Sequence, residues 1–357
     1  MRTVMAWLVA EVGCAAHAYR MRMAFVLLLG ALASISCAST PRAVPAADVT
    51  SANALQARGT VHLDVVHSDA LGVDKRVAVY LPPSYGSDAS RRFPVIVYLH
   101  GLFGSETDWL SKGGLDAVAD SLAGAGRGEA ILVMPDGDDG WWTDWAVEGS
   151  YSVCTDTLRT EDPTRYCIRN HRYEDWVTRD LVAFVDSHYR THADRAHRGI
   201  AGLSMGGVGA LTLALRHPDL FTAAMSHSGV VSVLLDDSNP FTAPARYVAT
   251  PDSVRAPAAS WKSRLMLALG PSVERWREYQ PADLAARLQR SGAPLPALRF
   301  DCGTEDALLA ENRALHWELQ RLGVPHGYGE WPGAHSWRYW HDRSPDGLAW
   351  MLARVGG

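Results

Sequence analysis

The segment Gly202-Leu203-Ser204-Met205-Gly206 places a serine between two glycines, with an apolar run before it and another after it. The first run has the length of a buried strand. The second predicts a helix that continues to about Leu215 and ends before Pro218. This pattern is typical of a nucleophile elbow, a sharp strand-to-helix turn that exposes the serine hydroxyl above the edge of a sheet. The glycines let the strand and the helix approach closely. We therefore predict that Ser204 is the nucleophile of an acyl-transfer reaction.

A serine hydroxyl needs a base to remove its proton during attack, and a carboxylate must hold that base in the correct tautomer. After an elbow of this kind, the acid and then the histidine follow in the chain, on loops after later strands. His335 lies in a glycine-flanked loop between the last predicted strand and the last predicted helix, so we predict that it is the base. Asp306 follows the predicted strand 298–302 and is the preferred acid. The weaker candidates are His326 and His341 for the base, and Asp301 and Glu305 for the acid.

An oxyanion hole requires two main-chain N–H groups directed at one point. The N–H of Met205 directly follows the nucleophile, and we expect the second from Leu102, in the loop after an earlier strand. The preceding His100-Gly101 also fits a simpler interpretation, a tight turn with a buried histidine, and the two interpretations are compatible.

Several tryptophans lie in loops near these residues and could line a pocket for the acyl or alcohol group of a substrate. One segment, 141–145, follows the predicted strand that ends at Asp136. Packing of the same tryptophans within their own loops is an equal alternative. The residues predicted to contact substrate are His100, Gly101, Trp109, Trp142, Asp144 and Trp337.

The segment 136–140 has the acidic and glycine-rich composition of a calcium loop. It lacks the spacing and the closing glutamate of an EF-hand, and no Cys/His cluster in the chain has zinc-ligand spacing. We therefore expect neither a metal ion nor another cofactor.

Strands and helices alternate along the chain, which predicts an α/β fold with a mainly parallel central sheet, helices on both faces and the site at the carboxyl ends of the strands. The segment from about 231 to 280 interrupts this alternation and is expected to be an insertion over the active site. The predicted strands are 60–66, 76–81, 93–99, 130–134, a run that begins at Arg198, 223–229, 298–302 and 326–331. The predicted helices outside the elbow are 115–123, 173–189, 281–290, 308–322 and about 339–354.

Two arginines precede the apolar run 23–33, and small residues follow it. This is the layout of a secretory signal peptide, and the run is too short to span a bilayer. We therefore expect residues 1–38 to be the leader of an exported protein, periplasmic, membrane-anchored or secreted, whose true start is Met21 or Met23.

Cys37 resembles the acceptor cysteine of a bacterial lipoprotein, so a lipid anchor is one expectation. Cleavage by ordinary signal peptidase after Ala38 or Ala46 is the other. Residues 39–59 are rich in Ala, Pro and Ser and are expected to form a disordered tether. Residues 60–357 then form one domain.

Cys154 and Cys167 bracket a polar loop, and we expect a disulfide between them in an oxidising compartment. Two free thiols would be the better interpretation in a cytoplasmic protein. Cys302 has no thiol-protease context and is expected to be a small buried side chain.

The formal net charge is −5, and no block of like charges interrupts the sequence. This balance argues against nucleic acid as a partner. The oligomeric state is left open by the sequence.

Four blocks of the sequence, in this order, resemble the putative-esterase family of α/β-hydrolases, and the resemblance extends from about Val77 to the C-terminus. That family includes tributyrin, feruloyl and acetyl-xylan esterases, S-formylglutathione hydrolases, siderophore-trilactone esterases and secreted mycolyltransferases. The resemblance implies an α/β-hydrolase fold, the triad Ser204, Asp306 and His335, and the oxyanion donors Leu102 and Met205. The blocks are 99–105 with Trp109, 201–207, 302–306 and 333–335.

These observations predict an exported serine carboxylesterase that forms an acyl-enzyme on Ser204 and acts on a small-molecule or glycan-linked ester. The alternatives are acyl transfer to a sugar alcohol, as in mycolyltransferases, and hydrolysis of a siderophore trilactone or a feruloyl ester. A hydrolase fold that binds a glycan or a partner without catalysis is the alternative from a different class. The sequence does not decide the acyl and alcohol specificity.

Overall fold

The computed structural model describes residues 58–146, 168, 170–236, 241–253 and 259–356. These residues lie in one compact unit, Asn53–Gly357. The predicted leader, Cys37 and the expected Cys154–Cys167 disulfide fall outside the described residues.

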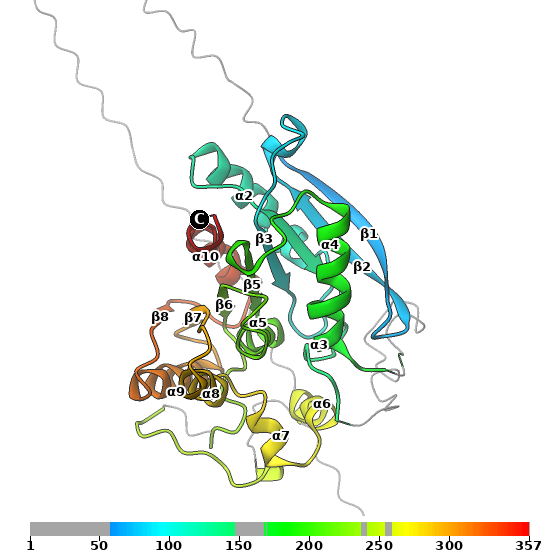
Figure 1. The fold of residues 1–357 in the computed structure, drawn as a ribbon. Helices are drawn as coiled ribbons and strands as arrows, with labels where there is room; N and C mark the ends of the chain where they lie inside the picture. Colours follow the sequence, from blue (N-terminus) through cyan, green and yellow to red (C-terminus); the bar gives the residue numbers. More distant parts are fainter. Residues whose placement is uncertain (1–57, 147–167, 169, 237–240, 254–258, 357) are drawn as a thin grey trace, which may run out of the picture. The chain divides into compact units, whose positions relative to one another are not determined.

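A single sheet of eight strands organises this unit, in the order β1-β2-β4-β3-β5-β6-β7-β8 (Figure 1). The first two strands form an antiparallel hairpin, β2 also pairs antiparallel with β4, and all other neighbours are parallel. The predicted mainly parallel sheet is therefore confirmed. The strands are β1 (Thr60–Ser68), β2 (Val73–Leu81), β3 (Val95–Leu99), β4 (Ile131–Pro135), β5 (Arg198–Leu203), β6 (Ala223–His227), β7 (Ala297–Gly303) and β8 (His326–Trp331).

Helices cover both faces of the sheet, so the central strands are buried along their whole length. Successive side chains of a strand point to opposite faces. In β3, Val95, Val97 and Leu99 join one core layer, whereas Ile96 and Tyr98 join the other. This explains the continuous apolar runs in the sequence. The first layer packs against α4 (Val182–His188), α5 (Met205–Arg216), α8 (Pro281–Ser291) and α9 (Leu309–Arg321), and the second against α2 (Leu115–Gly124) and α10 (Trp337–Val355).

The segment predicted as one helix over 173–189 is divided. A single turn, α3 (Tyr173–Asp175), leads into a π-helical stretch, Trp176–Leu181, before α4 begins. The hydroxyl of Thr178 donates to the carbonyl of Glu174, four residues earlier, at 2.8 Å. Hydrophobic periodicity does not separate the two helix types over so short a segment, because they differ by one residue in the hydrogen-bond spacing.

Among its described residues, the insertion predicted at about 231–280 contains the α-helices α6 (Ala259–Leu269) and α7 (Val273–Arg277). It packs against the segment 139–146: the N–H of Ala146 donates to the carbonyl of Ala268 at 2.8 Å. Arg275 donates to the carbonyl of Asp144 at 2.6 Å. The insertion is therefore attached to the loop that follows β4.

In the part of the chain that the structure describes, no helix combines the length and the apolar character needed to cross a membrane.

Candidate active site

Ser204 occupies a strained turn between β5 and α5, with φ 53° and ψ −117°. Few side-chain-bearing residues adopt a positive φ, and such strain persists only where the surroundings enforce it. Here the N–H of Ser204 donates to the carbonyl of His227 at 3.0 Å. A Cβ at Gly206 would lie 2.3 Å from the carbonyl oxygen of Leu99, and one at Gly202 would lie 2.2 Å from that of Gly206. The glycines of the motif are therefore required by close backbone contacts on both sides of the serine.

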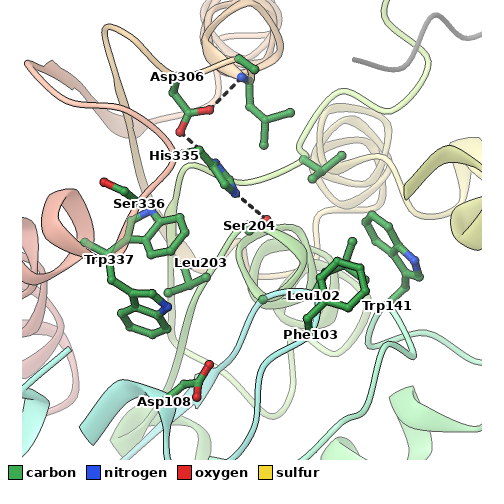
Figure 2. A pocket seen from close by; sticks show the side chains of 15 residues that line it. Leu102, Phe103, Asp108, Trp141, Leu203, Ser204, Asp306, His335, Ser336 and Trp337 are labelled. Atoms are coloured by element: carbon green, nitrogen blue, oxygen red, sulfur yellow. Dashed lines mark hydrogen bonds and ion pairs between the residues drawn. The ribbon is translucent and has the colours of Figure 1, made fainter. Parts of the chain in front are cut away.

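Ser204, His335 and Asp306 form one hydrogen-bonded row (Figure 2). The Nε2 atom of His335 lies 3.0 Å from the Oγ of Ser204, and its Nδ1 lies 2.9 Å from the Oδ2 of Asp306. An ionised carboxylate can only accept a hydrogen bond, so Nδ1 carries the proton and Nε2 is left to accept the serine hydroxyl proton. The row contains the groups of a nucleophile, a base and an orienting acid in the correct sequence.

The carboxylate of Asp306 is buried, and its ionised form is held by its partners. Burial acts to raise its pKa, but the hydrogen bond and positive charge of His335 and the N–H of Leu308, at 2.8 Å, outweigh it and lower the pKa below the ordinary value. Asp306 therefore stays ionised at neutral pH and can stabilise a protonated imidazole.

The structure separates the weaker candidates from this row. Asp301 faces His227 and accepts from Tyr339, whereas Glu305 is exposed. His326 lies 2.8 Å from His316, and His341 is next to Asp342 at the surface.

The expected oxyanion-hole residues border Ser204. Leu102 lines the same cavity as Ser204 and lies within a tight turn, in which the N–H of Gly104 donates to the carbonyl of Gly101 at 3.1 Å. A Cβ on Gly101 would lie 3.3 Å from the Cβ of Ser204, so the main chain at Gly101 and Leu102 passes close to Ser204. Met205 is the first residue of α5, where N–H groups have no partner within the helix.

A cavity of about 640 Å³ opens in front of Ser204. Two of the residues predicted to contact substrate, Gly101 and Trp337, line it. Figure 2 shows aromatic and aliphatic side chains around the row of Ser204, His335 and Asp306. Such a lining suits an apolar group of a substrate. The other lining residues are Leu102, Phe103, Asp108, Trp141, Leu203, Val230, Ala307, Leu308, Ser336 and Trp340.

Four residues predicted to contact substrate have other roles, and two of them support the loops beside the cavity. His100 is buried: its Nδ1–H donates to the carbonyl of Gly101 at 2.8 Å, and its Nε2 accepts the N–H of Gly137 at 3.0 Å. The indole of Trp142 donates to the carbonyl of His100 at 3.2 Å. Both side chains therefore hold backbone in place and do not reach the cavity.

The other two, Trp109 and Asp144, are also engaged by the protein itself. Trp109 is fully buried, and its indole donates to the carbonyl of Leu99 at 3.0 Å. The carboxylate of Asp144 accepts the N–H groups of Glu174 and Asp175 at 3.1 and 3.3 Å, at the start of α3. Neither residue is among those that line the cavity.

Phe103 and Trp141 line the cavity, although Phe103 was not predicted to do so and Trp142 was the tryptophan singled out from the segment 141–145. Phe103 has φ 61°, Trp141 has φ 58° and Trp142 has φ 55°. Two consecutive residues in the left-handed region turn the chain so that Trp141, and not Trp142, faces the cavity. No signal in the sequence predicts this, because residues with side chains rarely adopt such a conformation.

The carboxylates of the acidic segment after β4 are paired with protein groups. Lys75 is buried, and its Nζ lies 3.0 Å from Asp136 and 2.9 Å from Asp138. Asp139 binds the N–H of Phe103 and the guanidinium of Arg264. Among the described residues, no group of three or more His, Cys, Asp and Glu side chains could hold a metal ion.

Cys302 is a free, buried thiol, and burial raises its pKa. It therefore has the properties of a small apolar side chain, as expected from the sequence.

The sheet order, the serine elbow and the loops that follow β7 and β8 together define an α/β-hydrolase fold. The chain belongs to the putative esterase family, whose model matches residues 68–351. Esterase Rv1288 of Mycobacterium tuberculosis (strain ATCC 25618 / H37Rv) is 29% identical over 278 residues, which cover 76% of this chain and 54% of the relative. The chain thus spans about half the length of the curated relatives it matches.

Solved structures share the fold. A ferulic acid esterase matches with a TM-score of 0.61 and 23% identity, covering 83% of this chain and 98% of that chain. An S-formylglutathione hydrolase from Agrobacterium tumefaciens matches with a TM-score of 0.61 and 22% identity, covering 84% and 96%. At these identities the likeness concerns the fold alone.

Proposed function

We propose that this protein is a serine carboxylesterase, with Ser204 as nucleophile, His335 as general base and acid, and Asp306 as the orienting carboxylate. The observation that carries the proposal is the unbroken row of hydrogen bonds from Ser204 through His335 to Asp306, at 3.0 and 2.9 Å. Membership of the putative esterase family supports an ester as the substrate.

In the proposed reaction, the Oγ of Ser204 bonds to the ester carbonyl carbon while its proton passes to the Nε2 of His335. The carbonyl oxygen becomes an oxyanion, which the N–H groups of Leu102 and Met205 stabilise. When the carbon–oxygen bond to the alcohol breaks, His335 gives its proton to the leaving oxygen. Water then adds to the acyl-enzyme by the same route, with His335 as base, and releases the carboxylic acid.

The apolar and aromatic cavity lining favours an ester with an apolar acyl or alcohol group. Acyl transfer to a sugar alcohol remains the second candidate within the same mechanism, because an apolar cavity also slows the entry of water. The proposal includes export, for which the signal-peptide layout of residues 1–38 is the support.

The test is hydrolysis of p-nitrophenyl esters by the wild type and by Ser204→Ala. We expect the variant to lose about 10⁴-fold or more in kcat. Feruloyl and acetylated-sugar esters, with and without an added sugar alcohol, identify the acyl group and the acceptor. Turnover by Ser204→Ala close to that of the wild type would refute the proposed mechanism.

A further inference from the structure

The oxyanion loop after β3 is tied to the loop after β4 by a buried carboxylate. Phe103, directly after Leu102, has φ 61°, and its N–H donates to the Oδ1 of Asp139 at 2.7 Å. Asp139 is fully buried. A residue with a side chain keeps a positive φ only where surrounding contacts enforce it. The hydrogen bond from Phe103 is one such contact, and it acts one peptide away from the Leu102 N–H.

The other oxygen of this carboxylate binds the insertion. The Nη1 of Arg264, on α6, donates to the Oδ2 of Asp139 at 2.9 Å. The same guanidinium lies 5.0 Å from the centre of the Phe103 ring, on its face, within the range of a cation–π contact. Arg264 therefore contacts Phe103 twice, directly through its ring and indirectly through Asp139.

A buried carboxylate is stable in its place only while its charge is paired and its oxygens accept hydrogen bonds. Loss of Arg264 would remove the guanidinium that donates to the Oδ2 of Asp139, so the Asp139 side chain would be held less firmly. The N–H of Phe103 would then have a less firmly fixed acceptor, and the peptide unit that joins Leu102 to Phe103 could rotate and displace the adjoining peptide, which carries the Leu102 N–H. Oxyanion stabilisation is sensitive to such rotation because it depends on donors fixed before the reaction.

We propose that Asp139 and Arg264 are positioning residues, through which the insertion helix α6 fixes the oxyanion loop Gly101–Gly104 beside Ser204. This inference rests on the proposed function. It gives the insertion a part in catalysis, although the described residues that line the cavity include none from α6 or α7. The insertion acts on the reaction through Arg264 and the backbone of Phe103.

The variants Arg264→Met, Arg264→Lys and Asp139→Asn test this inference in the full chain. Arg264→Met is expected to lower kcat about 10- to 100-fold with KM within about threefold, since the oxyanion forms only in the transition state. Arg264→Lys keeps the charge and should recover kcat to within about threefold of the wild type. Asp139→Asn should lower kcat in the same direction as Arg264→Met.

A second readout is inhibition by a trifluoromethyl ketone, whose adduct with serine carries an oxyanion. Its inhibition constant should rise in proportion to the loss of kcat/KM, as expected for a transition-state mimic. The matched control is Arg198→Met, which breaks another partly buried Arg–Asp pair, Arg198 with Asp186 at 2.6 Å, at the start of β5. This control should lower the unfolding midpoint and leave kcat within about twofold.

Two results would overturn the inference: kcat for Arg264→Met and Asp139→Asn within about twofold of the wild type, or an equal loss of kcat in the Arg198→Met control. Turnover by Ser204→Ala at the rate of the wild type is a different result. It would refute the proposed function, and this inference with it.

Discussion

The main-chain N–H of Ser204 donates to the carbonyl of His227 at 3.0 Å, so Ser204 is held by the neighbouring strand β6. The side chain of that same His227 is buried against Asp301, at 2.9 Å, and Asp301 in turn accepts the hydroxyl of Tyr339 at 2.8 Å. A second His–Asp pair therefore lies beside the first. The His335–Asp306 pair contacts Ser204 through the His335 side chain, and the His227–Asp301 pair contacts it through the backbone carbonyl of His227.

These two pairs allow a matched comparison of Asp306→Asn with Asp301→Asn. Asp306→Asn should lower kcat by about 10⁴-fold, because an amide no longer fixes the productive tautomer of His335. Asp301→Asn should lower the free energy of unfolding by about 3 kcal/mol, because it disrupts a buried hydrogen-bonded pair, and should leave kcat within about tenfold. Ester hydrolysis and urea unfolding measure the two effects. A large kcat loss in Asp301→Asn, with kcat nearly unchanged in Asp306→Asn, would show that Asp301 is the acid.

Asp306 should also make stability depend on pH. Its pKa is lowered in the folded protein, because the His335 contacts and the Leu308 N–H outweigh the effect of burial. The folded state therefore binds this proton more weakly than the unfolded state does. Its stabilising contribution is fully present above the unfolded pKa of about 3.9. It is lost as pH falls toward the lower, folded pKa.

Urea unfolding of the wild type and Asp306→Asn between pH 7 and pH 3 measures this contribution. The difference in unfolding free energy between the two proteins should be constant above about pH 5 and shrink below about pH 4. A difference that grows as the solution becomes more acidic contradicts the predicted sign.

Gly206→Ala should disrupt the elbow. The added Cβ would lie 2.3 Å from the carbonyl oxygen of Leu99 and 2.5 Å from that of His100, and neither backbone atom can move without shifting β3. We expect a loss of about 3 kcal/mol in the free energy of unfolding and a loss of most activity. Gly86→Ala is the matched control, because its Cβ would meet no atom within 4 Å. Equal unfolding midpoints for the two variants would contradict the steric argument.

Trp337 and Trp109 should respond differently to substitution, although their rings are in edge contact at 5.6 Å. Trp337 lines the cavity, so Trp337→Ala should enlarge it and shift the preference toward longer acyl chains by about tenfold in kcat/KM. Trp109→Phe should lower stability by about 2 kcal/mol, because it removes buried ring atoms and a hydrogen bond to Leu99, and should leave the acyl preference unchanged. A series of p-nitrophenyl esters from acetate to decanoate gives both profiles. An unchanged profile in Trp337→Ala would exclude this side chain from the acyl site.

Local signals in the sequence were sufficient for most of the fold. The strand bounds predicted for β8 are those of the structure, and those predicted for β7 and α8 differ by at most one residue at each end. The glycines around Ser204 predicted the elbow, because few other residues permit so close a contact of strand and helix. These features depend on neighbours in the chain, which a single sequence displays.

Tertiary structure decided which side chains meet. Asp301 and Asp306 are five residues apart and equal as candidates by type, but Asp301 lies directly opposite His227 in the β6–β7 register, whereas Asp306 lies beyond the strand, within reach of His335. Trp141 lines the cavity where Trp142 was predicted, because Trp141 and Trp142 both adopt a positive φ. Arg264 contacts Asp139, although the two residues are 125 positions apart in the sequence. Strand register, rare backbone conformations and long-range packing depend on the whole folded chain, and for this reason the local pattern predicted the nucleophile but not all of its surroundings.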